Sequence, residues 1–241
     1  MIVTVVTWNL HGSARPDLDA VADRIRALDA DVVALQEVQP RQARTLGRRL
    51  RWGTLYWSFK HLPLGKPAEG LAVLSPRIVH DARAVVLSQG QPPWTYRRRI
   101  AQLCDLAVAG RRLPLANCHL ASDEPAERRA QAERLVAHLG PGTVVAGDLN
   151  ARPGSDTLEP LLRFGLHDAG PGGATNWRPS DPDDRPTNRL DYVLVPEGVR
   201  VTSATVPAAA DTDLRAWRRL SDHLPVRVGL DVVQSPAGTS K

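Results

Sequence analysis

The chain has 241 residues, of which 42% are hydrophobic, so its composition is far from that of a disordered protein. No apolar run is long enough for a helix to span a bilayer, and two cysteines are too few for a disulfide scaffold. The formal net charge of +5 favours polyanions such as nucleic acid or phosphorylated substrates, although a general bias towards arginine would give the same balance.

Apolar patterns predict alternating strands and helices along the whole chain. Short runs rich in Val, Leu and Ile predict strands at residues 2–8, 31–35, 70–75, 99–108, 113–118, 142–147, 190–195, 200–206 and 224–231. Helical periodicity is present at 17–29, 41–51, 124–139 and 155–165, with Asp17, Asp123 and Ser155 as the expected caps. Hairpin-like connections such as "AGRR" mix with helical crossovers, which predicts mixed sheets with helices outside them.

No linker divides the chain, so we expect one domain over residues 1–233 and a frayed tail over 234–241. The N-terminus lacks the basic lead and cleavage site of a secretory signal, so we expect a cytoplasmic protein, and a monomer. Cys104 and Cys118 could face each other across a hairpin, but we expect them to be reduced. The polar, Pro-rich segment 171–188 is typical of a functional loop.

Polar side chains gather where the predicted strands begin or end. They are Asn9, Glu37, His119, Asp148 and Asn150 after strands, and Glu69, Asp191, Asp222 and His223 before strands. Charged groups are unfavourable in an apolar core, so these strand ends are expected to converge on an acidic pocket with two histidines. Asp148 and Asn150 would project together, because side chains two apart in a strand share a face.

The ordered set "WN", "LQE", "NCHL", "GDLN", "LDY" and "SDH" resembles the endonuclease/exonuclease/phosphatase superfamily, which includes deoxyribonuclease I, exonuclease III and the neutral sphingomyelinases. The resemblance runs from "TWNLHG" to "SDHLPV", nearly the whole chain. It implies a four-layered αββα sandwich of two mixed β-sheets flanked by helices, with the site at one end. It also implies phosphoester hydrolysis by water, assisted by Mg²⁺ or Mn²⁺.

The resemblance also implies the metal ligands and the acid–base groups. Glu37 would be the main metal ligand, supported by Asn9, with Asp222 as a second ligand. Asp191 would orient His223 to activate water, and Glu69 would orient His119 towards the phosphate or the leaving group, although the two roles could be exchanged.

The remaining residues carried over from the family would hold the substrate. Asp148 would position the water or the metal, and Asn150 would donate to a phosphate oxygen. Arg98 would contact substrate, and Thr175 or Asn176 would bind phosphate.

Simpler explanations exist for single residues. Asp148 could form a turn in "DLNARPGSD", Glu69 could lie in an exposed loop, and Asp191 could be an ordinary surface charge.

The chain also departs from the exonuclease III-like branch, since His11 stands where an aspartate commonly joins the metal site. The short segment between His119 and Asp148 lacks the tyrosine-bearing loop of abasic-site enzymes, which argues against abasic-site repair.

Three functions compete. A metal-dependent nuclease that cuts DNA, or less favourably RNA, is supported by the basic charge and by "QPPWTYRRRIAQ", whose Trp94 and Tyr96 would suit base stacking. The alternative is a phosphodiesterase or phosphatase acting on a small or lipid-headgroup phosphate ester. A scaffold protein without catalysis is disfavoured, because it would have little reason to tolerate so many mutually repelling acids.

Overall fold

The computed structural model describes residues 1–61, 68–92, 95, 98–178, 185–206 and 213–232. The expected tail at 234–241 and the aromatic pair Trp94 and Tyr96 lie outside the described residues.

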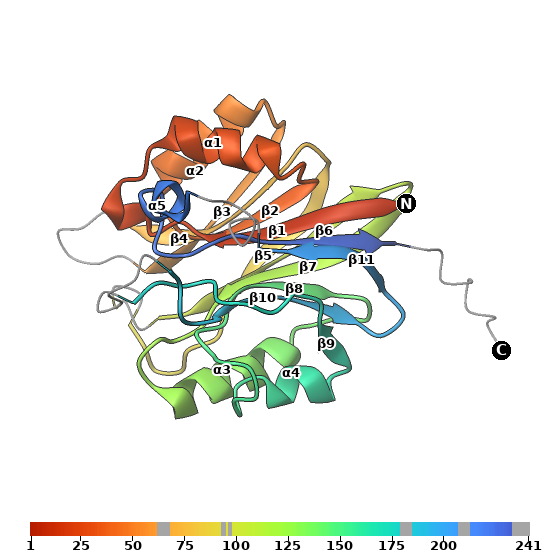
Figure 1. Cartoon of the computed structure of the whole chain (residues 1–241). Helices are drawn as coiled ribbons and strands as arrows, with labels where there is room; N and C mark the ends of the chain where they lie inside the picture. Colours follow the sequence, from red (N-terminus) through yellow and green to blue (C-terminus); the bar gives the residue numbers. More distant parts are fainter. Residues whose placement is uncertain (62–67, 93–94, 96–97, 179–184, 207–212, 233–241) are drawn as a thin grey trace.

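The described strands form two six-stranded sheets (Figure 1). The first sheet has the order β11 (Arg200–Thr205), β12 (Val226–Asp231), β1 (Ile2–Asn9), β2 (Val32–Val38), β4 (Glu69–Ser75) and β3 (Thr54–His61). The second has the order β5 (Val79–Val86), β6 (Ile100–Val108), β7 (Arg111–His119), β8 (Val144–Asp148), β10 (Asp191–Pro196) and β9 (Leu166–Asp168). Each sheet combines one parallel pair, β1–β2 or β7–β8, with antiparallel pairs, so the prediction of mixed sheets is confirmed.

Helices cover the outer face of each sheet and complete the predicted four layers (Figure 1). The helices α1 (Leu18–Ala27), α2 (Pro40–Leu50) and α5 (Leu214–Arg218) lie on the side of the first sheet, and the short 3₁₀ turn η1 (Gly12–Ala14) follows β1. On the other side, α3 (Pro125–Val136) and α4 (Glu159–Arg163) cover the second sheet. The αββα sandwich expected from the sequence is therefore confirmed.

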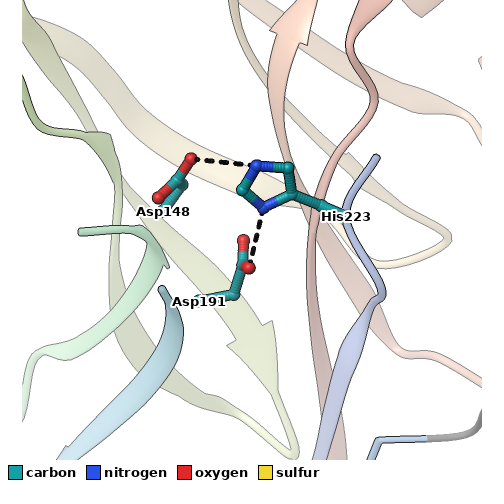
Figure 2. Close-up of side chains that lie close together, drawn as sticks. All are labelled: Asp148, Asp191 and His223. Carbon is teal, nitrogen blue, oxygen red and sulfur yellow. Dashed lines mark hydrogen bonds and ion pairs between the residues drawn. The ribbon is translucent and has the colours of Figure 1, made fainter. Parts of the chain in front are cut away.

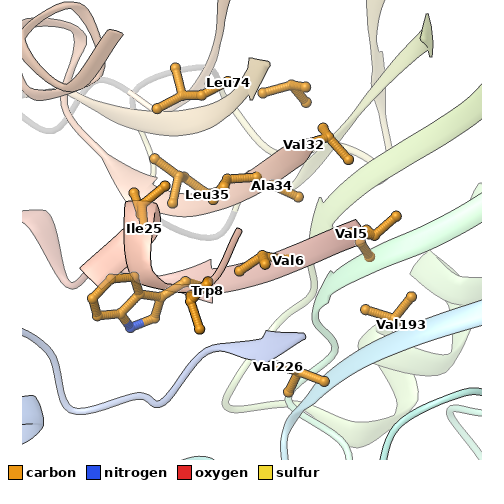
Figure 3. Close-up of a cluster of buried hydrophobic side chains, with 14 of the residues drawn as sticks. Val5, Val6, Trp8, Ile25, Val32, Ala34, Leu35, Leu74, Val193 and Val226 are labelled. Carbon is orange, nitrogen blue, oxygen red and sulfur yellow. The ribbon is translucent and has the colours of Figure 1, made fainter. Parts of the chain in front are cut away.

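The apolar core follows from strands that are buried on both faces. In β8, Val144 and Ala146 belong to the cluster that includes the first sheet, whereas Val145 belongs to the cluster that includes residues of α3 and α4. The same alternation places Val193 of β10 in the cluster shared with Val5 of the first sheet (Figure 3). Such strands read as continuous apolar runs, and each fully buried Val or Leu contributes about 1.5–3 kcal/mol.

Three strands and one helix escaped prediction, because they carry no strong apolar period. The edge strand β5 is largely exposed, the edge strand β3 is a half-buried aromatic run, β9 has three residues and α5 has five.

Asp17 caps α1 as expected, with its carboxylate accepting from the backbone N–H of Asp19 and Ala20.

The expected caps Asp123 and Ser155 are wrong. The N-caps of α3 and α4 are Glu124 and Leu158, and each helix has a proline within its first two positions. Proline has its φ preset for a helix start and lacks the N–H that a cap would satisfy, so the helices begin there.

The two cysteines do not face each other. Cys104 pairs with Leu115 in the β6–β7 register, and Cys118 pairs with Ala101. Their side chains lie in different apolar clusters, and both thiols are free.

The sheet topology gathers the predicted strand ends at one end of the sandwich. Parallel neighbours end together, so the ends of β1 and β2 are adjacent, as are those of β7 and β8. The antiparallel strand β10 begins where β8 ends, with Asp191 opposite Asp148. The strand ends of one sheet face those of the other, so residues far apart in the sequence can share one site.

The close approach of β8 to β7 predicts that any side chain at Gly147 destabilises the fold. A Cβ at this position would lie 2.0 Å from the carbonyl oxygen of Cys118. We expect Gly147→Ala to lower the free energy of unfolding in urea by about 1–3 kcal/mol, as overpacking does. Gly53→Ala is the matched control, since its Cβ meets nothing within 4 Å, and it should change stability by less than about 1 kcal/mol. Equal effects of the two substitutions would contradict the prediction.

Candidate active site

The buried carboxylate of Asp148 is the centre of the candidate site. Its Oδ2 lies 3.0 Å from Asn9 Nδ2, 3.5 Å from His119 Nε2 and 3.8 Å from His223 Nε2. Its Oδ1 accepts the backbone N–H of Asn150 at 2.9 Å. Asn9 comes from the first sheet and His119 from the second, so this carboxylate joins the strand ends of both sheets.

His223 is held on both sides of its ring (Figure 2). Its Nδ1 lies 2.9 Å from Asp191 Oδ2, which is the contact expected from the sequence. Its backbone is fixed too, because its N–H donates to Ser221 Oγ at 3.0 Å and its carbonyl accepts from Trp8 Nε1 at 2.9 Å. The ring therefore has a defined orientation with Nε2 directed towards Asp148.

Asn176 contacts the same ring nitrogen. Its Nδ2 lies 3.0 Å from His223 Nε2 and 3.2 Å from the carbonyl oxygen of Asp222. A carbonyl oxygen only accepts, so this nitrogen is a donor, and towards it Nε2 acts as an acceptor. The neutral ring then carries its proton on Nδ1, facing Asp191.

The local charges favour the protonated ring. Burial lowers the pKa of His223, but the carboxylates of Asp191 and Asp148 outweigh burial and raise this pKa to about 10. Burial raises the pKa of Asp148 to about 6, against the opposing effect of His223. The ring thus has partners for both protonation states, as a proton-transferring group requires.

The structure places Lys60, not Glu69, beside His119. His119 Nδ1 lies 3.2 Å from Lys60 Nζ, and His119 Nε2 lies 3.5 Å from Asp148 and 3.8 Å from Glu37. Glu69, expected to orient this ring, interacts with Ser13. The cause is a β-bulge in β3 between Phe59 and His61, which changes the direction of the intervening Lys60.

Lys60 is a buried residue of the site that our sequence reasoning missed. Burial lowers the pKa of its ammonium group to about 8, although Glu37 acts in the opposite direction. As an ammonium it can only donate, so His119 accepts at Nδ1 and keeps its proton on Nε2. The sequence signal was a lysine closing the aromatic run "TLYWSFK", but that strand was not predicted.

Arg98, expected to contact substrate, instead contacts the backbone of β3. Its Nη1 lies 3.3 Å from the carbonyl oxygens of both Phe59 and Lys60. This guanidinium therefore supports the bulge that carries Lys60.

Glu37 lies in a second bulge, where the β2–β4 register shifts between Leu35 and Val38. Its φ of 50° is unusual for a residue with a side chain, and such backbone geometry is enriched at functional sites. Its side chain is 25% exposed, so it is accessible to a ligand.

The donor groups of the site fit a divalent cation. Burial and then the nearby charge of Glu37 raise the pKa of Glu69, so two carboxylates crowd here. Asp148, Asp191 and His223 form a second group, whose ligand atoms lie within 4.8 Å of one another. Glu69 Oε1 and Asp191 Oδ1 are buried without a hydrogen-bond partner in the part of the chain that the structure describes. Such oxygen-rich sets suit hard cations.

Asp222, expected as a second metal ligand, is paired with His11. Its Oδ1 lies 3.2 Å from His11 Nδ1. The hydrogen bond to Asp222 is the main reason why the pKa of His11 is raised, despite opposition by burial. His11 thus already holds this carboxylate in the metal-free structure, and the metal-binding role expected for Asp222 stays a prediction.

Two expected phosphate-binding side chains are engaged elsewhere. Asn150 Nδ2 donates to the carbonyl oxygen of Leu120 at 3.0 Å, so this amide supports the turn. Thr175 is fully buried, and its Oγ1 accepts the backbone N–H groups of Leu190 and Asp191 at 3.0 and 3.2 Å. Thr175 therefore positions the start of β10, and Asn176 is the member of that pair that reaches the site.

The sequence model of the Endonuclease/Exonuclease/phosphatase family matches residues 6–223 of this chain. The chain belongs to this family. Family members are typically phosphoester hydrolases that use divalent metal ions, which agrees with the donor set around Asp148. None of the described helices is long and apolar enough to cross a membrane.

Solved structures of other proteins share the fold. An endonuclease/exonuclease/phosphatase protein from Beutenbergia cavernae has a TM-score of 0.79 at 23% identity, over 98% of this chain and 73% of that one. The mannosyl-6-phosphatase from Bacteroides thetaiotaomicron has a TM-score of 0.70 at 19% identity, over 95% of this chain and 99% of that one. The human nocturnin catalytic domain has a TM-score of 0.74 at 20% identity, over 95% of this chain and 94% of that one. A comparison with curated protein sequences found no significant match.

The charge balance at His223 predicts a pH-dependent contribution to stability in metal-free protein. The folded pKa of about 10 exceeds the ordinary 6.5, so this contribution is fully present below about pH 6.5 and is lost as the pH rises through 10. We expect the difference in unfolding free energy between wild type and His223→Gln, measured in urea with EDTA, to shrink between pH 7 and 10.

The difference between the two proteins, and not the wild-type curve alone, is diagnostic. The pKa of Lys60 is lowered, so its contribution to stability changes with pH in the opposite direction. A difference that stays constant across this range would show that His223 is not stabilised by its carboxylates.

Proposed function

We propose that this protein is a divalent-metal-dependent phosphodiester hydrolase, with a nucleic-acid strand as its first substrate class. The observation that supports this most is the shared contact of Asp148 with His119 and His223, one from each side of the site. Two histidines around one buried carboxylate can serve the two proton transfers of hydrolysis.

His223 is the proposed base that activates water. Asp191 holds Nδ1, so in the neutral ring Nε2 is the atom that takes the proton from the attacking water. The neutral ring would be favoured once a bound cation offsets the carboxylate charges that raise the pKa of His223 in the metal-free protein. Asp148 stabilises the imidazolium that forms, because its Oδ2 lies 3.8 Å from that nitrogen. Asn176 occupies Nε2 at 3.0 Å, and its side chain must move aside or share this nitrogen when water binds.

His119 is the proposed donor on the opposite side. Lys60 fixes the proton on Nε2, which is then directed towards the region between Asp148 and Glu37. From there it can donate to a phosphoryl oxygen or to the leaving oxygen. Asn9, through its contact with Asp148 Oδ2, keeps this carboxylate in place.

Glu37 is the proposed main metal ligand, with the adjacent carboxylate of Glu69 available as a second oxygen donor. A bound Mg²⁺ or Mn²⁺ would neutralise charge on the phosphoryl oxygens. The proximity of the two carboxylates makes a cation here electrostatically favourable.

The substrate class rests on charge. The net charge of +5 and the arginines beside the site favour a strand with several phosphates. The second candidate is a phosphatase or phosphodiesterase acting on a small phosphate ester. It is supported by the structural similarity to a mannosyl-6-phosphatase over 95% of this chain.

A substrate panel separates the two candidates. Plasmid DNA, RNA, mannose 6-phosphate, inositol phosphates, sphingomyelin and bis-p-nitrophenyl phosphate would each be tested with Mg²⁺ and with EDTA. Cleavage of DNA that weakens steeply with salt supports the nuclease, since phosphate contacts release counterions. Turnover confined to a small ester supports the second candidate, and no turnover of any substrate would refute the proposal.

The assigned acid–base roles predict loss of turnover in two variants. His223→Gln and Asp148→Asn should each lower kcat by about 10²–10⁴-fold on the best substrate of the panel, with folding checked by circular dichroism. His138→Gln and Asp29→Asn are matched controls at exposed positions and should keep wild-type activity. Near-wild-type kcat in a folded His223 or Asp148 variant would remove that residue from the mechanism.

The assignment of Glu37 predicts a specific change in metal dependence. Glu37→Gln keeps the size of the side chain but removes its charge, so we expect the Mg²⁺ concentration for half-maximal activity to rise by at least about tenfold. Glu133→Gln, at an exposed position on α3, is the control and should leave the titration unchanged. An unchanged titration in Glu37→Gln would place the metal elsewhere.

A further inference from the structure

Four exposed arginines follow one another along α2 and form what we call the arginine row. Arg41, Arg44 and Arg48 are three and four residues apart, so they share one face of the helix, and Arg51 is its C-cap residue. All four line a hollow of about 550 Å³ between α2 and the edge strand β3. No acidic side chain is among the described residues that line this hollow, so it is strongly positive.

The charges of the arginine row are not compensated within the described part of the chain. Arg48 Nη2 donates to Thr45 Oγ1 at 3.4 Å, and none of the four guanidinium groups makes an ion pair with a described residue. By contrast, the neighbouring Arg49 pairs with the carboxylate of Asp19 in α1.

The arginine row is unfavourable for the helix that carries it. Like charges three or four residues apart destabilise a helix, and Arg41 in the first turn is also opposed by the helix dipole. The first turn of α2 contains no acidic residue that would offset this cost. A role in binding an external anion therefore accounts for the row better than a role in folding.

The arginine row begins beside the proposed metal site. The helix α2 starts shortly after Glu37, and Gln42 in its first turn donates to the carbonyl oxygen of Gly12, close to the end of β1, at 2.8 Å. At its other end α2 leads into β3, which returns to the site with Lys60. The row therefore leads from the site along the outer layer of the first sheet (Figure 1).

The length of the arginine row matches a short stretch of nucleic-acid backbone. The row extends over about ten residues, or about 15 Å of helix. One strand of a duplex carries about four phosphates over that length, since its charges are about 3.4 Å apart. A ligand with a single phosphate could not contact the whole row.

The lining of the hollow favours a nucleic-acid strand over a membrane surface. Trp52 and Leu55 are half-buried and add apolar area beside the arginines. A base can stack on an indole ring while guanidinium groups bind the adjacent phosphates. An interfacial helix inserts apolar side chains into the bilayer, whereas Ala43, Leu46 and Leu50 of α2 are buried in the core.

We propose that the arginine row binds the phosphate backbone of the substrate strand beyond the cleaved bond, so that the enzyme prefers a polynucleotide to a small ester. This inference rests on the proposed phosphodiester hydrolysis and specifies the length of its substrate. Each phosphate bound by an arginine releases counterions, so the salt dependence of binding reports the number of contacts.

Binding to metal-free protein tests the row without turnover. Fluorescence anisotropy in EDTA would measure the affinity for a labelled oligothymidylate of about 20 nucleotides at several salt concentrations. The double variant Arg44→Gln/Arg48→Gln should weaken binding by at least about tenfold at low salt. It should also reduce the slope of log affinity against log salt by about 1.4, because each lost contact to a single strand removes about 0.7.

A matched control separates the row from net charge. The double variant Arg112→Gln/Arg200→Gln removes the same charge from exposed arginines that pair with Asp81 and Asp231. It should change the affinity for the oligothymidylate by less than about twofold. Equal effects of the two double variants, or no binding of the oligothymidylate by the wild type, would overturn the proposal.

Urea unfolding separates binding from a structural role. Loss of Arg44 and Arg48 should leave the free energy of unfolding unchanged or raise it, because like charges are removed from one helix face. A clearly destabilised double variant would assign these arginines to folding and contradict the proposal. Row-dependent binding to phosphatidylserine vesicles, with unchanged binding of the oligothymidylate, would overturn it in favour of a membrane surface.

Turnover distinguishes failure of the row from failure of the proposed function. The Arg44→Gln/Arg48→Gln variant should raise the ratio of KM for the oligothymidylate to KM for bis-p-nitrophenyl phosphate by about tenfold. An unchanged ratio would refute the role of the row while the proposed function stands. If the oligothymidylate binds through the row but no substrate of the panel turns over, the proposed function fails while the binding surface stands.

Discussion

The site depends on one carboxylate that is almost completely removed from water. Asp148 is 1% exposed, and a charge in such a position is tolerated only when polar groups surround it. Those groups come from four places in the chain: Asn9 at the end of β1, His119 at the end of β7, Asn150 in the turn after β8 and His223 before β12. The packing of one sheet on the other is thereby tied to the arrangement of the site.

Buried hydrogen bonds between the two sheets, next to the site, support this arrangement. Gln36 Nε2 lies 2.9 Å from Asn117 Oδ1, and Asn117 Nδ2 donates to backbone carbonyls of the first sheet at 3.1 Å. Gln36 immediately precedes Glu37, and Asn117 lies two residues before His119. Gln36 Oε1 is buried without a hydrogen-bond partner among the described residues, but the directional hydrogen bonds of the other atoms favour one relative placement of the two sheets. These hydrogen bonds therefore help to hold the two halves of the site in register.

Several departures from regular backbone geometry lie at the site. Glu37 and Lys60 lie in bulges, and His11, Glu37 and Asn150 have left-handed backbones. Bulges redirect side chains that strict alternation would send into the core, and the strain is borne by the surrounding sheets. The regular strands supply the stability, and their irregular ends direct acids, imidazoles and an ammonium group towards one another.

The sequence by itself determined the fold class and which strand ends carry the candidate site residues. Continuous apolar strands such as "TVVAG", each ending in a polar residue, carry a local signal, and the order of the motifs specified Asp148, Asp191 and His223. Only the tertiary structure decided the partners: Lys60 at His119, His11 at Asp222, and two arginines at Asn188. Periodicity reports which face of an element is buried, whereas these contacts depend on bulges, edge strands and turns whose geometry is set by residues distant in the chain.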